Sequence, residues 1–311
     1  MAYKLESLIK VAEKYYYDDL THNEIASETG LSRVTVTRML KAARNRGIVR
    51  ITIDKAPVNT MAISEMLRKR FGLRDAVIVD ETPGYSNEED ALLYKAAANY
   101  FSGIIRPGNT IGLGWGNSVY RMIKCMESHS RRDATFIPII GGTEENDEIY
   151  NLNNIVQEAS KKSSCEHLKL YAPAIVDTKA VCEAIKSDSK ISMVCDIWNS
   201  LDVVVVGIGA LKTKMSKKIN DFLSQHTVDF SQLGIVADVC CNYLDINGDV
   251  VSTILNDTLI AVNIKQLKKA PLTIGIAFGH EKTKAIRACL KNGFIDSLIT
   301  DAGTAQTLLE E

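Results

Sequence analysis

The sequence lacks several features that would assign it to a specialised class of protein. Its seven cysteines and five histidines form no C-x-x-C pair, which argues against a structural zinc site or a disulfide framework. No apolar run approaches the roughly 18 residues of a membrane span, and the first residues lack the pattern of a secretory signal. We therefore expect a cytoplasmic protein with reduced thiols, no metal and no other cofactor.

The sequence also has no excess of positive or negative charge. The formal net charge is -1, and the apolar fraction of 46% and charged fraction of 24% are those of an ordinary globular protein. This balance excludes a chain that is basic throughout, so any contact with nucleic acid must come from a local patch. A length of 311 residues accommodates one small and one large domain, or two of medium size.

The first 55 residues, called the head below, predict a helix-turn-helix. Apolar residues follow helical spacing over 5–17. Thr21 and Glu24 then form a capping-box pattern for a second helix, and Gly30 suits the left-handed residue that ends it. Ser32 can cap a third helix.

The outward face of the third predicted helix indicates contact with DNA. Hydroxyls and arginines suit the base edges of the major groove and the phosphates beside it. Between residues 31 and 50 there are six basic residues and no acidic one, the charge pattern of a phosphate-binding surface. The alternative is a solvated basic face on a structural helical domain. The residues expected at DNA are Ser32, Arg33, Thr35, Thr37, Arg38, Lys41 and Arg44.

Gly47 opens an apolar run over 48–53 that predicts a short strand or wing, so the head is expected to be winged-helix-like. A linker is expected around 55–57, and residues 56–311 then form the second domain.

In this second domain, apolar β-branched runs alternate with amphipathic stretches, which predicts an α/β fold with a largely parallel, Rossmann-like sheet. Asn247-Gly248 adds a strong hairpin signal. The expected strands are 76–79, 110–113, 135–139, 168–171, 203–207, 272–277 and 297–300. The expected helices are 88–105, 117–126, 152–162, 178–187, 217–226 and 282–292.

Small-residue loops follow four of these strands. Open parallel sheets bind ligands at the carboxyl ends of their strands, and glycine lets backbone amides approach a ligand closely. Four such loops at one sheet edge predict a pocket for a polar metabolite, with a phosphate group allowed by the helix N-termini that follow. The loops are 112–118, 141–143, 207–209 and 278–282.

The order of these segments resembles the SorC/DeoR-type sugar-responsive bacterial transcription regulators, over nearly the whole chain. The resemblance implies a second domain similar to ribose-5-phosphate isomerases and glucosamine-6-phosphate deaminases but without their catalysis. It also implies a homotetramer that binds operator DNA and changes its DNA affinity when a sugar or sugar phosphate binds. The resemblance rests on the head and on 112–118, 138–142, 170–174, 202–210, 237–245 and 275–304.

The family's effector pocket can be carried over onto matching positions. A carboxylate such as Asp238 accepts hydrogen bonds from sugar hydroxyls, and an ammonium such as Lys282 pairs with a phosphate or a hydroxyl. Ile140 stands where some members carry an imine-forming lysine, so covalent capture is not expected. The implied effector residues are Trp115, Asn117, Ser118, Gly141, Gly142, Thr143, Asp238, Asn242 and Lys282. Asn242 replaces a frequent arginine, which leaves phosphate recognition optional.

Two alternatives remain open at this point. A sugar-phosphate isomerase or deaminase would use Asp238 as general base, with Glu144 or Glu145 as a second acid. That reading leaves the basic helix unexplained, so the regulator is favoured and no catalytic residue is expected. Cys240 and Cys241 could form a strained vicinal disulfide, but two thiols on opposite sides of a strand are favoured.

Overall fold

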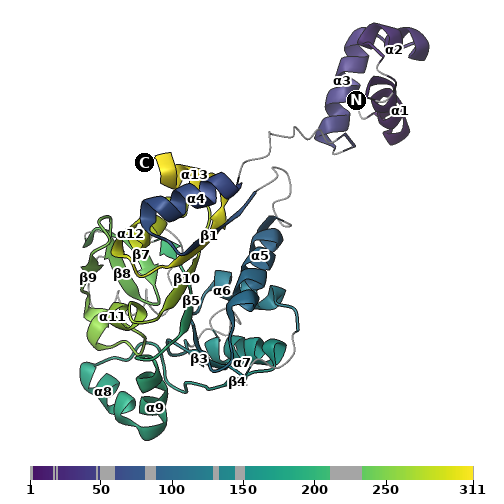
Figure 1. The fold of residues 1–311 in the computed structure, drawn as a ribbon. Coiled ribbons are helices and arrows are strands. Elements are labelled where there is room, and N and C mark those ends of the chain that lie inside the picture. The colour runs from purple at the N-terminus through teal and green to yellow at the C-terminus, as the bar shows by residue number, and fades with distance from the viewer. Residues whose placement is uncertain are drawn as a thin grey trace. The chain divides into compact units, whose positions relative to one another are not determined.

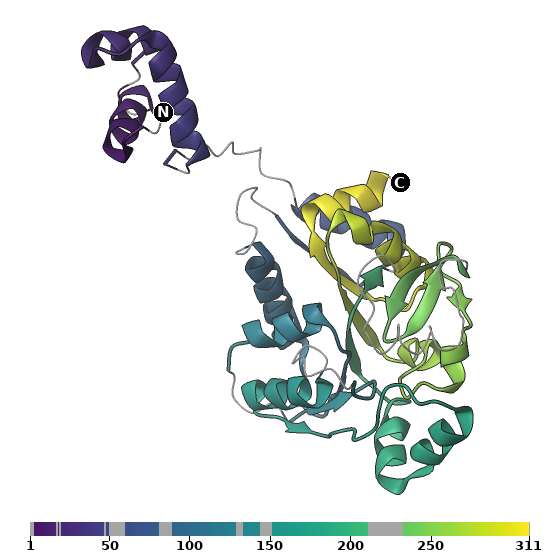
Figure 2. The same cartoon turned by 180° about the vertical axis from the view of Figure 1, so that it is seen from behind.

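The computed structural model describes residues 3–16, 18, 20–46, 48–49, 60–80, 89–128, 133–143, 151–210 and 233–310. The chain divides into two compact units, Met1–Ala56 and Pro57–Glu311. Each unit has a hydrophobic core of its own, and Figures 1 and 2 show the helices and strands that make up each unit. The first unit corresponds to the head with one further residue, and the second is called the large domain.

The head consists of α1 (Leu5–Tyr16), α2 (His22–Thr29) and α3 (Arg33–Asn45). Their apolar faces meet in a core that includes Leu8, Ile25, Val36, Leu40 and Ala43. Such burial on one stripe of each helix, rather than the propensity of short helices, is what stabilises a unit of this size. The strand or wing predicted over 48–53 lies mostly outside the described residues.

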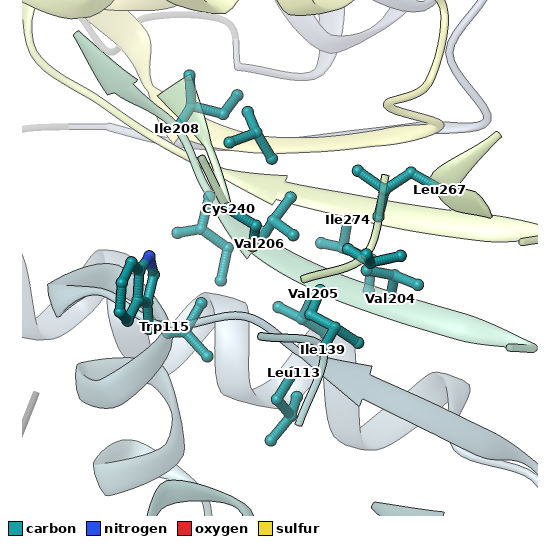
Figure 3. Close-up of a cluster of buried hydrophobic side chains, with 14 of the residues drawn as sticks. Leu113, Trp115, Ile139, Val204, Val205, Val206, Ile208, Cys240, Leu267 and Ile274 are labelled. Atoms are coloured by element: carbon teal, nitrogen blue, oxygen red, sulfur yellow. The ribbon is translucent and has the colours of Figure 1, made fainter. Parts of the chain in front are cut away.

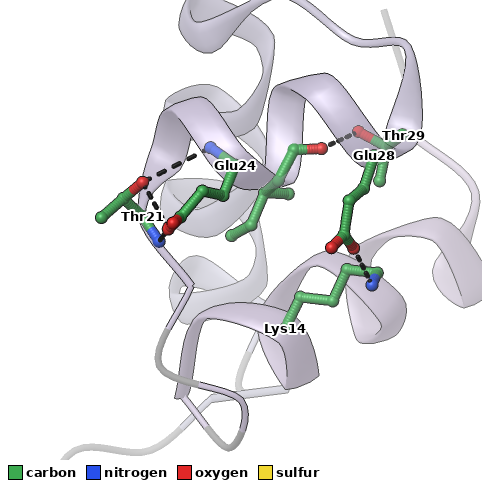
Figure 4. A network of polar contacts seen from close by, with 6 residues as sticks. Lys14, Thr21, Glu24, Glu28 and Thr29 are labelled. Atoms are coloured by element: carbon green, nitrogen blue, oxygen red, sulfur yellow. Dashed lines mark hydrogen bonds and ion pairs between the residues drawn. The ribbon is translucent and has the colours of Figure 1, made fainter.

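Local hydrogen bonds fix the ends of the head's helices as the sequence predicts. The backbone N–H of Thr21 donates to Glu24 over 2.7 Å and the Thr21 hydroxyl accepts from the Glu24 N–H, so the capping box is confirmed (Figure 4). Gly30 ends α2 with φ 68°, and the Ser32 hydroxyl accepts from the Thr35 N–H to begin α3. An ion pair between Lys14 and Glu28 joins α1 to α2.

A seven-stranded parallel sheet forms the centre of the large domain, in the order β1-β11-β10-β5-β2-β3-β4. The expected α/β class with a mostly parallel sheet is therefore confirmed. The strands are β1 (Asp75–Val79), β2 (Thr110–Leu113), β3 (Thr135–Pro138), β4 (Glu166–His167), β5 (Val203–Gly207), β10 (Leu272–Ile276) and β11 (Ser297–Asp301). Several are apolar throughout because helices cover the sheet.

One predicted strand is wrong. Residues 168–171 are not a strand, since β4 ends at His167. Beyond it, the side chain of Asn153 takes over both backbone groups of Leu170. Its Oδ1 accepts from the Leu170 N–H over 2.9 Å and its Nδ2 donates to the Leu170 carbonyl over 3.0 Å. The pattern that predicted a strand thus belongs to an irregular segment in which Leu170 is buried and Tyr171 is 77% exposed.

The large domain also contains helices, several of which pack against the parallel sheet. They are α4 (Thr60–Phe71), α5 (Glu89–Ile104), α6 (Asn117–Cys125), α7 (Leu152–Ser163), α8 (Lys179–Ser187), α9 (Ser189–Ile197), α11 (Ile264–Leu267), α12 (Thr283–Asn292) and α13 (Ala302–Glu310), with 3-10 turns η2 (Ile254–Asp257) and η3 (His280–Lys282). α5, α6, α7, α8 and α12 match predicted helices. The sequence did not predict α4, α9, α11 or α13. The predicted helix at 217–226 lies outside the described residues.

A small antiparallel sheet lies beside α12, in the order β6 (Gly209–Ala210), β7 (Ile235–Val239), β8 (Asn242–Asp245) and β9 (Val250–Val251). The predicted Asn247-Gly248 hairpin is confirmed between β8 and β9. The prediction that Cys240 and Cys241 lie on opposite sides of a strand is wrong. Both are free thiols in the two-residue turn between β7 and β8.

Among the described residues, no helix meets the length and hydropathy of a membrane span. The same part of the chain contains no group of three or more His, Cys, Asp or Glu side chains arranged to hold a metal ion.

Candidate functional site

The face of α3 opposite the head's core is exposed and basic. Arg33, Lys41 and Arg44 lie along it at spacings of one or two helical turns, and Arg38 lies beside them. Within the described chain, none of these four cations takes part in an ion pair. The face therefore keeps its full positive charge available to a polyanion.

The hydroxyl residues on α3 are partly engaged in the helix itself. The Ser32 hydroxyl caps the helix and lies 2.8 Å from the Thr35 hydroxyl. The Thr37 hydroxyl donates to the Arg33 carbonyl and retains its capacity to accept. Val34, which the sequence reading passed over, is 59% exposed on the same face. Its methyl groups suit the methyl of thymine, and an apolar side chain at an exposed helix position was the signal for it.

Trp115 and Ser118 are brought to the carboxyl edge of the sheet, beside the loop after β5. Trp115 is 9% exposed and belongs to the same buried hydrophobic cluster as Leu113 and Cys240 (Figure 3), and Ser118 is 7% exposed. A Cβ at Gly207 would lie 3.9 Å from the Ser118 Cβ and 4.0 Å from the Trp115 carbonyl oxygen. The first and third glycine loops of the sequence therefore adjoin.

Asn117 lies on the exposed side of α6, where the Arg121 Nε donates to its Oδ1 over 3.0 Å. The Arg121 guanidinium lies 5.7 Å from the ring centre of Tyr94, and Tyr94 meets Phe278 edge to face at 5.8 Å. Sequence reading missed Arg121 and Tyr94, although the i,i+4 spacing of Asn117 and Arg121 was visible. These contacts connect the first loop to the fourth.

The Gly141-Gly142 segment lies close to other backbone segments and forms hydrogen bonds with them. A Cβ at Gly141 would lie 2.5 Å from the Pro173 carbonyl, so only glycine fits. The Gly141 N–H donates to Ile260, and the Gly142 N–H donates to Ala172 over 2.9 Å. The Thr143 hydroxyl is buried without a hydrogen-bond partner in the part of the chain the structure describes. The Thr143 side chain can therefore still form a hydrogen bond with a ligand.

Asp238 lies on β7 opposite Gly209 of β6. Its Oδ1 accepts from the Cys241 N–H over 2.8 Å. Burial raises the pKa of Asp238 to about 6, although the Cys241 N–H works in the opposite direction. Burial and the Asp238 charge together raise the pKa values of the Cys240 and Cys289 thiols. The carboxyl is therefore a group that titrates near neutral pH among thiols that stay protonated.

Asn242 is placed differently from the other expected effector residues. Its buried side-chain amide donates to the carbonyls of Val239, Cys240 and Val262 over 2.9–3.2 Å. These bonds hold the turn between β7 and β8 from within. No amide hydrogen is left to face a ligand.

Lys282 ends η3, and η3 packs against β6, the strand that pairs with Asp238. Burial lowers the pKa of Lys282, while the adjacent Glu281 raises it. The loop before it is held by two residues that the sequence reading missed. The Gly279 N–H donates to Asp301 over 3.0 Å and to the Thr304 hydroxyl over 2.8 Å.

The enzyme alternative needs a second acid near Asp238. Glu144 and Glu145, the candidates, lie outside the described residues. Among the described residues, the Asp238 charge raises the pKa values of three thiols and of the Tyr243 hydroxyl. No described carboxyl is thus paired with Asp238 in the manner of an isomerase.

Comparison with known families divides the chain much as the fold does. Residues 55–310 match the family described as "Putative sugar-binding domain". Residues 7–58 match the Crp-like helix-turn-helix domain.

Curated relatives align over almost their whole length. The sorbitol operon regulator of Klebsiella pneumoniae is 29% identical over 306 residues, covering 97% of each chain. The deoxyribonucleoside regulator of Bacillus subtilis (strain 168) is 22% identical over 99% of this chain and 98% of its own.

Solved structures of regulators of the same kind are also similar to this chain. The crystal structure of the full-length K. pneumoniae sorbitol operon regulator SorC superposes with a TM-score of 0.76, at 29% identity and 98% coverage of both chains. A DeoR family transcriptional regulator from Listeria monocytogenes gives a TM-score of 0.73 at 26% identity, over 80% of this chain and 99% of its own.

Proposed function

The chain belongs to the sugar-binding family of SorC- and DeoR-type transcriptional regulators, and we propose that it controls genes of carbohydrate metabolism by binding their operator DNA in a sugar-dependent way. The observation that carries this proposal is the exposed basic face of α3 in a helix-turn-helix unit, joined in one chain to a sugar-binding domain. The effector is a sugar or sugar phosphate, and the setting is the cytoplasm.

In this proposal α3 enters the major groove. Arg33 and Arg38 donate to base edges or phosphates, Lys41 and Arg44 pair with phosphates, and Val34 meets a thymine methyl. Ser32 and Thr35 secure the start of the helix. Because each chain carries one head, operator geometry calls for at least a dimer, and a homotetramer is proposed from the family resemblance.

The effector site lies at the carboxyl edge of the parallel sheet. Asp238 accepts from sugar hydroxyls, Ser118 and Thr143 offer hydroxyls, and Lys282 supplies a cation for a phosphate or hydroxyl. Trp115 forms an apolar wall. Asn117 acts through Arg121, whereas Gly141, Gly142 and Asn242 shape the surroundings of the site. The chain is proposed to sense its sugar without converting it.

A direct test titrates the full-length protein against DNA from upstream of its own gene at two salt concentrations. Sorbitol, fructose 6-phosphate, ribose 5-phosphate and glucosamine 6-phosphate are added in turn. Binding should weaken steeply with salt, and one compound should shift the affinity. Turnover of a sugar phosphate without any DNA binding would support the isomerase alternative and reject the regulator.

A further inference from the structure

The loop 278–282, which carries Lys282, is held from one side by two buried side chains. Asp301 ends β11 and is 3% exposed, and Thr304 lies in the first turn of α13 and is 2% exposed. Gly279 donates its single N–H to both of them. The Thr304 hydroxyl in turn donates to the Asp301 carboxylate. These contacts form a closed triangle of hydrogen bonds among Gly279, Asp301 and Thr304, called the latch below.

Helix capping accounts for only part of the latch. Asp301 accepts from the Thr304 N–H over 2.6 Å, which is the bond expected where a helix begins. The bonds to Gly279 reach 22 and 25 residues along the chain, and a cap does not require them. They fix Gly279 at φ 99°, a conformation that residues with a side chain rarely adopt. The latch therefore sets the path of the loop.

The latch also connects the loop to α13 and, through α13, to α4. α13 packs along α4 in both views (Figures 1 and 2). The Arg70 guanidinium of α4 donates to the Leu309 carbonyl, and Arg287 of α12 donates to the Thr307 and Leu308 carbonyls. In chain order, α4 is the first helix after the head. A continuous series of contacts thus leads from Gly279 through α13 to α4.

We propose that Asp301 and Thr304 are positioning residues for the effector site. Through them, binding of an effector at the 278–282 loop changes the position of α13. This inference rests on the proposed function, because it assigns a regulatory role within that site. Neither side chain touches the effector. An effector that engages Lys282 moves the loop, and the bonds to Gly279 require α13 to respond.

The test compares Thr304→Val with Thr304→Ser, since valine keeps the shape without the hydroxyl and serine keeps the hydroxyl. Thr307→Val is the matched control, because the Thr307 hydroxyl donates only within α13, to Gly303. Full-length protein is titrated on upstream DNA with the compound from the four-member panel that shifts wild type. Thr304→Val should raise the concentration for half-maximal response by about tenfold. Its affinity for DNA without sugar should stay within about twofold, and the serine and Thr307 variants should behave as wild type.

Hydrogen exchange gives an independent readout. Peptides covering 278–282 should exchange faster in Thr304→Val than in Thr307→Val, because the Gly279 amide loses a partner. Unchanged exchange with an unchanged midpoint overturns the latch. An equal loss of sugar-free DNA binding also overturns it, since that marks a purely structural role. If no compound shifts wild type, the proposed function itself fails, and the latch's regulatory role fails with it.

Discussion

Cys240 and Cys241 show how single residues shape the surroundings of the proposed effector site. Both have left-handed backbones, with φ 50° and 61°, in a two-residue turn where Asn and Gly are the usual occupants. The turn is held by Asp238, which accepts from the Cys241 N–H, and by the amide of Asn242. Several side chains therefore compensate for an unfavourable local conformation. They fix Cys240 against the first glycine loop.

Gly114 is the position most directly dependent on that placement. A Cβ there would lie 2.8 Å from the Cys240 Sγ. Gly114→Ala should lower the free energy of unfolding by about 1–3 kcal/mol through overpacking. Adding Cys240→Ala should restore part of the loss, because it removes the sulfur. Urea unfolding of both single variants and the double variant measures the coupling, and strictly additive losses would contradict this contact.

Asp238 should make stability depend on pH. Its folded pKa of about 6 exceeds the ordinary value of 3.8. The neutral carboxyl therefore favours the fold at low pH, and that contribution is lost as pH rises from about 4 through about 6. Its partial exposure reduces the effect to about 1–2 kcal/mol. Urea unfolding at both ends of this window should show a smaller fall for Asp238→Asn than for wild type. Equal falls would place the titration elsewhere.

At the scale of elements, α3 separates two roles on opposite faces. Val36, Leu40 and Ala43 are buried in the head's core, while the cations face outward. Arg46 is an exception among the basic residues, because its guanidinium donates to the Tyr3 carbonyl over 3.1 Å. One of the donors of this exposed guanidinium is therefore engaged within the head.

Replacing Arg33 or Arg38 by alanine should weaken binding to upstream DNA by about tenfold or more, while sugar binding is unchanged. Each loss should also reduce the dependence of affinity on salt. Lys190→Ala, an exposed cation of α9 in the large domain, is the charge-matched control. Fluorescence anisotropy at several salt concentrations provides the measurement, and equal effects of the α9 and α3 variants would refute the assignment.

The sequence predicted elements well where periodicity and caps agree. The head's helices and the apolar parallel strands are such cases. α9 was missed because it follows α8 directly, with Asp188 ending one helix and capping the other. The strand at 168–171 was predicted wrongly because the backbone groups of Leu170 bond to the side chain of Asn153, 17 residues earlier in the chain. Tertiary partners of this kind leave no local signal.

The candidate site also has features that the sequence predicted and features that it did not. Glycine loops at strand ends placed Trp115 and Ser118 near Gly207, as expected from parallel topology. Asp238 lies opposite Gly209 through the antiparallel pairing of β6 with β7, which the sequence did not predict. Neither the engagement of the Asn242 amide within a turn nor the bonds from Gly279 to α13 could be predicted. Both depend on which backbone groups the folded chain brings within about 3 Å.

For the molecule as a whole, two separate cores imply two separately stabilised units. Binding of an effector stabilises only the unit that holds it. Information must then pass from one unit to the other through whatever states of the large domain the effector selects.

Thermal unfolding of the full-length protein should therefore show two transitions, one for each unit. The compound that shifts DNA affinity should raise the melting temperature of the large domain by several degrees at saturating concentration. The transition of the head should move much less. Scanning calorimetry with and without the compound makes the comparison. A single transition raised as a whole would show that the units unfold together.

The contact between Asn153 and Leu170 replaces the end of a strand by a single side chain. The Leu168 N–H still donates to the Phe136 carbonyl of β3, but two residues later the Leu170 N–H and carbonyl both bond to the Asn153 amide. Leu170 is 2% exposed, so neither group could turn to water if that amide were lost. Asn153→Leu should therefore lower the free energy of unfolding by about 1–3 kcal/mol, and urea unfolding without such a loss would contradict this role.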